Sequence, residues 1–239
     1  MVGAGDAWVS SPESMAGAAH RRLEELIVTL QLEPGSRWSE ESLSNMIEVG
    51  RTPVREAVKR LQSDHLIKIL PRHGLMIAEI NLQEQLLVIE LRRELELLVS
   101  IRAARRSLGP ERLELGKKAD LIEQVCRDGD LAGYLREVSN ISLFIAKIAR
   151  NPFAERSISP LVALSRRFYF KYFSEIITLR EGGALHAARA RAVAAADEEA
   201  TMTTTTALMD QVEAYTRRIF MRSFGSTMVM FGDLPTKSK

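Results

Sequence analysis

The spacing of apolar residues changes about a third of the way along the chain and divides it into two parts. Short helical patterns and short apolar runs fill the first part, whereas long helical periodicity without strand patterns fills the second. We therefore expect a mainly α protein, with a small module at 16–80 and an antiparallel all-helical bundle at 81–228. The ends at 1–15 and 229–239 are expected to be flexible.

The pattern predicts three helices and a β-hairpin in the first part. One helix spans Arg21–Leu30, and Ser39 caps a second helix, whose first turn carries Glu40-Glu41, favoured there by the helix dipole. A third helix begins with Thr52 as N-cap and Pro53 at the first helical position, where a missing N–H has no partner to lose. The hairpin strands are the apolar runs Ile67–Leu70 and Leu75–Ala78, which flank the turn Pro71-Arg72-His73-Gly74.

The third helix is cationic on one face, because Arg51, Arg55 and Lys59 recur every four residues. Such a stripe alone is typical of any solvated helix. The hairpin that follows changes this interpretation, since helix, turn, helix and hairpin in this order indicate a winged helix-turn-helix. Between Arg51 and Arg72 there are six basic and two acidic residues, although the first 80 residues hold 9 Lys+Arg against 11 Asp+Glu. Positive charge is therefore concentrated where the helix and hairpin would contact phosphates and guanine edges.

The segment LEPGSRWSEESLSNMIEVGRTPVREAVKRLQSDHLIKILPRHGLMI resembles the N-terminal domain of the GntR family of bacterial transcription regulators, with RTPVREA at 51–57 as the signature. The resemblance implies a homodimer that binds an inverted repeat in double-stranded DNA. It assigns DNA contacts to Gly50, Arg51, Thr52, Arg55, His73 and Gly74, and the basic hairpin tip adds Arg72. Two positions depart from the family pattern. Gly50 replaces a usual Ser or Thr, and Asp64-His65 replaces a usual Gly, so we expect His65 in the left-handed region.

A run of long helices is predicted in the second part, beginning with Leu82–Arg106. Gly182-Gly183 is interpreted as a break between helices. The apolar flank of the first bundle helix consists of Leu87, Leu91, Leu95, Leu98 and Ile101. The other predicted helices are Pro110–Cys126, Leu131–Arg150, Pro152–Ile177, Leu185–Ala196 and Glu198–Phe224.

This second part resembles the FCD effector domain of the FadR-like branch of the GntR family. The resemblance depends on Glu90–Glu96, Ile145–Pro152, His186 and Ala195–Asp197. Many such domains hold a divalent metal with one Asp and three His, next to a small organic acid. The corresponding positions here are Val138, Ser142, His186 and Ala207. One ligand in four cannot hold a zinc-type ion, so no metal and no cofactor are predicted.

A bundle of this kind can still enclose a ligand, and the polar groups expected to face it are Arg92, Ser142, His186 and either Thr203 or Thr204. Arg92 inside a bundle needs an anion, which a ligand carboxylate or a nearby Glu96 could supply, and both alternatives stay open. The alternative for His186 is a hydrogen-bonded histidine of the core or of a helix start.

Composition excludes several other classes of protein. The 239 residues carry a net charge of +2, and a single cysteine fits a reducing cytoplasm without disulfides. No apolar run approaches membrane-spanning length. Phosphate-binding loops, nucleophile elbows and paired histidines are lacking, so an enzyme is not expected. The predicted function is that of a cytoplasmic, sequence-specific transcription regulator, a dimeric repressor whose operator affinity responds to a small organic acid or acyl ligand. The alternative is a ligand-independent regulator in which the bundle only dimerises.

Overall fold

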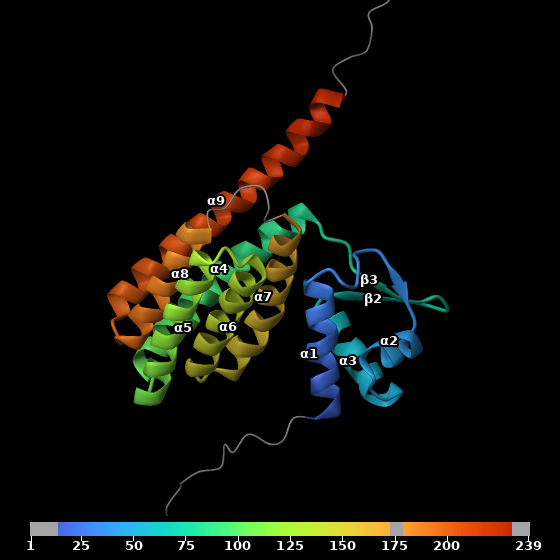
Figure 1. The fold of residues 1–239 in the computed structure, drawn as a ribbon, viewed down its shortest axis with the longest axis horizontal. Helices are drawn as coiled ribbons and strands as arrows, with labels where there is room; N and C mark the ends of the chain where they lie inside the picture. Colours follow the sequence, from blue (N-terminus) through green and yellow to red (C-terminus); the bar gives the residue numbers. More distant parts are fainter. Residues whose placement is uncertain (1–13, 173–178, 231–239) are drawn as a thin grey trace, which may run out of the picture. The chain divides into compact units, whose positions relative to one another are not determined.

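The structure is a computed structural model that describes residues 14–172 and 179–230, with side chains described to residue 222. The chain divides into two compact units, with the boundary between Glu79 and Ile80 (Figure 1). The flexible ends predicted at 1–15 and 229–239 lie almost entirely outside the described residues. None of the helices in the described ranges has both the length and the apolar character that a bilayer-spanning segment needs.

Three helices form most of the first unit: α1 (Met15–Val28), α2 (Glu40–Ile47) and α3 (Arg51–Ser63). Helix α1 begins six residues before its predicted start, because the Ser14 side chain accepts a hydrogen bond from the Gly17 N–H at 3.1 Å. At its first turns, His20 Nε2 lies 2.9 Å from Asp64 Oδ2 and so joins α1 to the end of α3. This contact was not anticipated, since the sequence places His20 in an otherwise unpatterned stretch.

The predicted start of α3 was wrong. The helix begins at Arg51, with Gly50 as N-cap and without a side-chain cap, so Thr52 is not the capping residue. Pro53 is tolerated inside the first turn because the N–H groups there have no intrahelical acceptor. The first intrahelical bond comes from Val54 N–H to Gly50 O at 3.3 Å. At the other end, His65 has a φ of 60°, which confirms the prediction of a left-handed residue after this helix.

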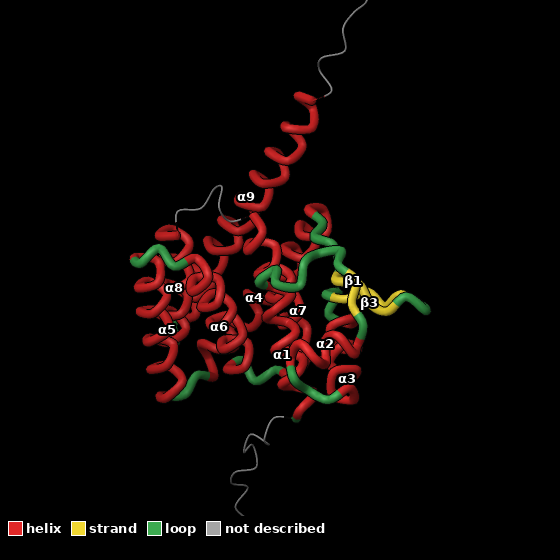
Figure 2. The backbone as a smooth tube through the Cα atoms, turned by 45° about the vertical axis from the view of Figure 1, so that its right-hand side comes forward, coloured by secondary structure: helices red, strands yellow, loops and turns green. Residues whose placement is uncertain are grey.

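The hairpin belongs to a three-stranded antiparallel sheet (Figure 2). Its strands β2 (Ile67–Leu70) and β3 (Gly74–Ile77) pair as predicted, and β3 also pairs with β1 (Arg37–Trp38), giving the order β1-β3-β2. Strand β1 was not predicted, because two residues are too few to show an alternating pattern. Gly74 has a φ of +80°, and a Cβ there would lie 2.6 Å from the Trp38 carbonyl oxygen. Glycine is therefore required where β3 meets β1.

Helices are the only regular secondary structure in the described part of the second unit. Helix α5 packs on α8, and α4 packs on α9 (Figure 1). Their shared core is apolar and draws on every one of these helices. The first unit is thus a winged helix-turn-helix and the second a helical bundle, which confirms the predicted fold class. The helices of the bundle are α4 (Leu82–Arg106), α5 (Gly109–Arg127), α6 (Leu131–Ile148), α7 (Pro152–Tyr172), α8 (Leu179–Ala194) and α9 (Glu198–Met230).

The apolar flank predicted for α4 is not its buried face. Leu87, Leu91 and Leu98 are 66%, 52% and 40% exposed. The buried face instead carries several polar side chains, among them Arg92 and Glu96. Periodicity failed here because leucines occur on most sides of this helix, and the inner side is chosen by polar partners on other helices.

Gly182-Gly183 is not a break, because α8 starts at Leu179 and runs through both glycines. A Cβ on Gly182 would collide with the Tyr134 hydroxyl, and one on Gly183 would collide with the Cys126 sulfur. The two glycines therefore allow α8 to approach α5 and α6 closely, at the cost of a lower helix propensity.

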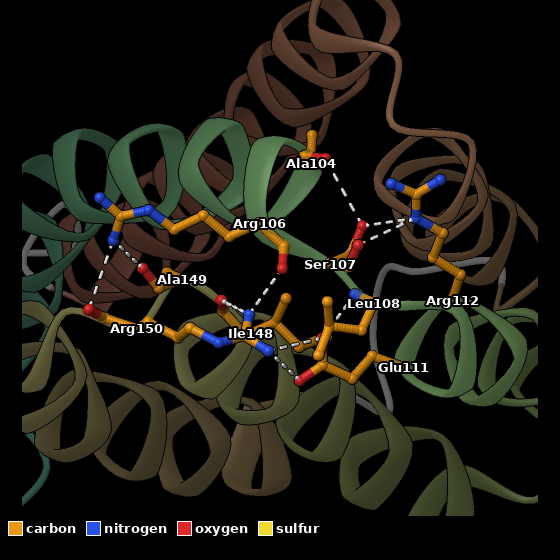
Figure 3. A network of polar contacts seen from close by, with 9 residues as sticks. All are labelled: Ala104, Arg106, Ser107, Leu108, Glu111, Arg112, Ile148, Ala149 and Arg150. Atoms are coloured by element: carbon orange, nitrogen blue, oxygen red, sulfur yellow. Dashed lines mark hydrogen bonds and ion pairs between the residues drawn. The ribbon is translucent and has the colours of Figure 1, made fainter. Parts of the chain in front are cut away.

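Hydrogen bonds from two arginines connect the C-terminal ends of α4 and α6 with each other and with the start of α5 (Figure 3). Arg106 Nη1 donates to the Ala149 carbonyl at 2.6 Å, and Arg150 Nη1 donates to the Arg106 carbonyl at 2.7 Å. The second arm of Arg150 donates to Glu111 Oε1 at 2.9 Å. Carbonyls left without partners at two helix ends are thereby satisfied.

Candidate nucleic-acid interface and ligand cavity

Short-range contacts fix the turn between α2 and α3. The Val49 N–H donates to the Ser44 carbonyl at 3.2 Å, the Ser44 hydroxyl donates back to the Val49 carbonyl, and Glu48 takes a left-handed φ of 55°. Gly50 offers no hydroxyl at the start of α3, where the family pattern has Ser or Thr. The turn leaves the first residues of α3 at the surface.

Residues predicted to contact DNA are all exposed and lie on two elements of the first unit. The tip of the hairpin is a tight turn, in which the His73 N–H donates to the Leu70 carbonyl at 2.9 Å and Arg72 adopts a φ of 64°. The first turns of α3 and the N-cap contribute Gly50, Arg51, Thr52 and Arg55, whereas the hairpin contributes Arg72, His73 and Gly74.

The two arginines at the start of α3 form ion pairs with the acidic first turn of α2. Arg55 Nε donates to Glu40 Oε2 at 2.9 Å, and Arg51 Nη2 contacts Glu41 Oε1. Sequence reasoning placed these glutamates at the helix N-terminus for the helix dipole and missed the pairs. The arginine side chains stay 65% and 61% exposed for Arg51 and Arg55, so both remain accessible to a partner from solution.

A cavity of about 100 Å³ lies inside the bundle. Arg92 and His186 line it, as the sequence led us to expect, and Glu181 and Arg218 are exposed members of its wall. Its remaining wall is formed by Tyr134, Leu135, Val138, Tyr169, Leu208, Met209, Gln211, Val212 and Tyr215.

Two of the side chains expected to face this cavity do not. Thr203 is exposed on α9, which buries Thr201 and Thr205 instead, so the prediction for Thr203 was wrong. Ser142 is fully buried but does not line the cavity. Its hydroxyl accepts a hydrogen bond from Arg189 Nη2 at 2.9 Å. The error on α9 arose because spacing alone did not fix which face of a threonine-rich helix turns inward.

Glu96 is shared by two buried arginines. Arg92 donates to Glu96 Oε1 through Nε at 3.2 Å and Nη2 at 2.9 Å, and Arg189 Nη1 donates to Glu96 Oε2 at 2.5 Å. Burial opposes ionisation, but the guanidiniums of Arg189 and Arg92 prevail and lower the pKa of Glu96 to about 2. The Arg92–Glu96 pair was one of the two alternatives left open by the sequence. Arg189 was missed, although it lies one helical turn after His186 on the same face of α8.

His186 is neutral inside the bundle. Burial lowers its pKa well below the usual value, and the nearby charges of Arg189 and Arg92 lower it further. Its Nδ1 atom is buried without a hydrogen-bond partner among the described residues, and its ring meets the edge of Tyr134 at 6.3 Å between centroids. A cavity wall that holds an orphaned ring nitrogen beside guanidiniums can receive a polar group from a ligand.

The side chains at the four family metal positions do not fit a metal ion. Val138 is apolar, the Ser142 hydroxyl is occupied by Arg189, and Ala207 is exposed and offers no ligand. Only His186 is a donor of the right kind, and two fixed guanidiniums lie near it. Within the described ranges, no group of three or more His, Cys, Asp or Glu is placed to hold a metal ion.

Comparison with known proteins points to one family. The sequence model described as bacterial regulatory proteins, gntR family, matches residues 16–77, and the FCD domain model matches residues 87–211. The HTH-type transcriptional regulator McbR of Escherichia coli (strain K12) is 30% identical over 101 residues, which are 42% of this chain and 45% of McbR. An uncharacterised HTH-type transcriptional regulator of Agrobacterium vitis is 34% identical over 71 residues, which are 30% of this chain and 42% of that protein. The matches span less than half the length of these relatives.

Solved structures share the fold over most of the chain. E. coli McbR aligns with a TM-score of 0.76 at 21% identity, covering 87% of this chain and 99% of that one. A GntR transcriptional regulator from a Rhodococcus species aligns with a TM-score of 0.63 at 18% identity, covering 85% of this chain and 98% of its own. Since the two family models together account for both folded units, the chain belongs to the gntR family of bacterial regulatory proteins and carries an FCD domain after the family's helix-turn-helix domain.

Proposed function

We propose that this protein is a sequence-specific DNA-binding repressor that acts as a homodimer and responds to a small organic acid bound in its helical unit. The observation that carries the proposal is the exposed arginine pair of α3, Arg51 and Arg55, in a winged unit of a regulator family. Such a protein works in the cytoplasm, where bacterial DNA lies.

In this proposal α3 enters the major groove of DNA. Arg55 forms a bidentate pair with guanine O6 and N7, whereas Arg51 and Thr52 contact base edges or phosphates at the helix start. Gly50 allows close approach of the backbone. The hairpin tip, with Arg72, His73 and Gly74, contacts the adjacent sugar-phosphate backbone. Two such units, held by a two-fold axis, would read an inverted repeat.

The exposed leucines of α4 supply a surface for the homodimer. Leu87, Leu91 and Leu98 follow one side of the helix and are between 40% and 66% exposed. A line of exposed leucines on one helix is typical of helix–helix association, because burying each one stabilises the dimer by roughly 1–2 kcal/mol. A second copy of α4 offers the same leucines and is therefore a matching partner.

The charge of the cavity favours an organic acid as effector. Arg92 and Arg189 share the single carboxylate of Glu96, and His186 is neutral, so this cluster of side chains keeps one net positive charge. A ligand carboxylate would neutralise it and give His186 a partner. The cavity volume of about 100 Å³ is below the range of drug-sized sites. It favours a small acid over a long acyl chain.

The second candidate is a regulator whose bundle only dimerises. It is favoured by Glu96, which already pairs with both arginines and removes their need for an outside anion. Thermal unfolding with a panel of small carboxylates separates the two candidates, because a ligand that binds only the folded protein raises its Tm. A rise that is lost in His186→Phe supports the effector site; no rise with any small acid favours the dimeriser.

The recognition face is tested by Arg55→Ala. An operator is first obtained by selecting bound duplexes from a random pool with wild-type protein. We expect Arg55→Ala to weaken operator binding by about 1–3 kcal/mol and to relax the preference at one base pair. Arg60→Ala is the control, since Arg60 is an exposed arginine on the opposite side of α3. Equal affinity and selectivity of Arg55→Ala and wild type would exclude this face as the reader of DNA.

A further inference from the structure

The arginines of α3 are held by carboxylates of α2 through different nitrogen atoms. Arg55 meets Glu40 with Nε, at 2.9 Å, whereas Arg51 meets Glu41 with Nη2. Both glutamates sit in the first turn of α2, where the helix dipole stabilises their charge and the Ser39 capping box fixes the backbone.

The guanidinium nitrogen that contacts the carboxylate determines which N–H donors remain available to DNA. A guanidinium has five N–H donors in a fixed planar fork, one on Nε and two on each Nη. A guanine pair made end-on uses Nη1 and Nη2. Glu40 contacts the Nε of Arg55, so both Nη atoms stay clear of this carboxylate. Glu41 contacts an Nη atom of Arg51 and so occupies one arm of that fork.

The two ion pairs also differ in how far their carboxylates are exposed to solvent. The Glu40 side chain is 37% exposed, whereas that of Glu41 is 61% exposed. An exposed ion pair contributes little free energy, so a phosphate can displace Glu41 from Arg51. A better enclosed carboxylate on the side of Arg55 restricts the rotamers of a long side chain before DNA arrives, which reduces the entropy lost on binding.

We propose that Glu40 is a positioning residue that aims Arg55 at its base, and that Glu41 is an internal competitor that lowers the general affinity of Arg51 for DNA. The acidic turn of α2 would thereby raise selectivity in two ways, by orienting one arginine and by restraining the other. This inference rests on the proposed DNA-binding function.

The proposal gives opposite expectations for neighbouring residues. Removing the carboxylate in Glu40→Ala weakens operator binding by about fivefold and reduces the preference for the base that Arg55 contacts. Binding to a scrambled duplex stays unchanged. Removing it in Glu41→Ala strengthens binding to both duplexes by about threefold and steepens the salt dependence, because one more cation reaches phosphate. Glu40→Gln retains an oxygen for Nε and restores part of the base preference.

The experiment measures the binding of full-length protein to the selected operator and to a scrambled duplex by fluorescence anisotropy at several salt concentrations. The control for net charge is Glu33→Gln, which changes an exposed glutamate of the same unit in the loop between α1 and β1. Base preference is read by repeating the selection with each variant. Far-UV circular dichroism and melting curves verify that each variant is folded.

A double-mutant cycle gives the sharpest readout. If Glu40 acts through Arg55, Glu40→Ala has no further effect on operator binding once Arg55 is alanine. An undiminished effect in that background overturns the positioning role, as does an increase in operator affinity in Glu40→Ala with unchanged preference. A Glu41→Ala variant that binds no better than Glu33→Gln overturns the competitor role. If wild-type protein enriches no duplex in the selection, the proposed DNA-binding function itself is wrong. This result differs from one in which wild type selects an operator but the glutamate variants do not behave as expected.

Discussion

The Glu96 side chain of the bundle is held by two arginines. It is fully buried, and both of its oxygens accept hydrogen bonds from arginines. Two guanidiniums that lose this carboxylate would remain charged in a medium that solvates them poorly. The free energy of unfolding should therefore depend on the ionisation of this one group.

Acidification should destabilise the bundle through Glu96. Its pKa is lowered from 4.5 to about 2, so the ionised form contributes stability that is complete above about pH 4.5 and is lost as the pH falls toward 2. The contribution is about 3 kcal/mol. Urea unfolding at neutral and acid pH measures it. We expect Glu96→Gln to be destabilised at pH 7 and to lose this pH dependence, whereas the exposed Glu94→Gln should behave as wild type.

His186 should stay neutral under mildly acidic conditions. Its pKa lies well below 6.5, so the neutral ring contributes stability that is present above about pH 6.5 and declines as the pH falls below it. The imidazole resonances of His186 should not titrate between about pH 7.5 and 6 in an NMR titration. A midpoint near the ordinary value would mean that solvent reaches the ring and that the cavity is more open than described.

Helices and turns with local sequence signals were predicted better than contacts between distant segments. Capping and turn signals are local, and they bounded α4 correctly and predicted the left-handed His65, although Thr52 and Pro53 misplaced the start of α3. Close approach between distant segments is not local. The glycines of α8 were interpreted as a break because the Tyr134 hydroxyl and Cys126 sulfur that require them lie on other helices. Strand β1 likewise exists only because β3 pairs with it.

The junction of β1 and β3 should be sensitive to one methyl group. In Gly74→Ala, the new Cβ would lie 2.6 Å from the Trp38 carbonyl oxygen, at a residue with positive φ. We expect a loss of about 1–3 kcal/mol in the free energy of unfolding. Gly50→Ala is the matched control, since its nearest neighbour would be 3.9 Å away. Thermal melts of the two variants give the comparison, and equal melting temperatures would show that the hairpin relaxes without cost.

The two candidate sites of this protein could be predicted only in part from its sequence. The exposed residues proposed to contact DNA follow from a local signature, whereas the partner of Arg92 depends on which face of α4 turns inward. Leucine periodicity favoured the wrong face, because packing with other helices decides burial. The same exposed leucines are now the basis of the proposed dimer.

The dimer should depend on the leucines of α4. Leu91→Glu places a charge in the middle of the proposed contact, and we expect it to produce monomers and to weaken operator binding at least tenfold. Leu113→Glu on α5 is the control, since Leu113 is 65% exposed but lies outside this surface. Sedimentation velocity reports the assembly state. Dimers that persist in Leu91→Glu would place the subunit contact elsewhere.

The carboxylate that Arg92 and Arg189 share also limits the routes by which this protein can evolve. Replacing Glu96 alone leaves two uncompensated guanidiniums in apolar surroundings, whereas exchanging all three side chains for leucine or methionine leaves no charge. A genotype that loses Glu96 before the arginines would be purged, so Glu96 is expected to disappear only after the arginines or together with them. A descendant without Glu96 should lack both guanidiniums as well.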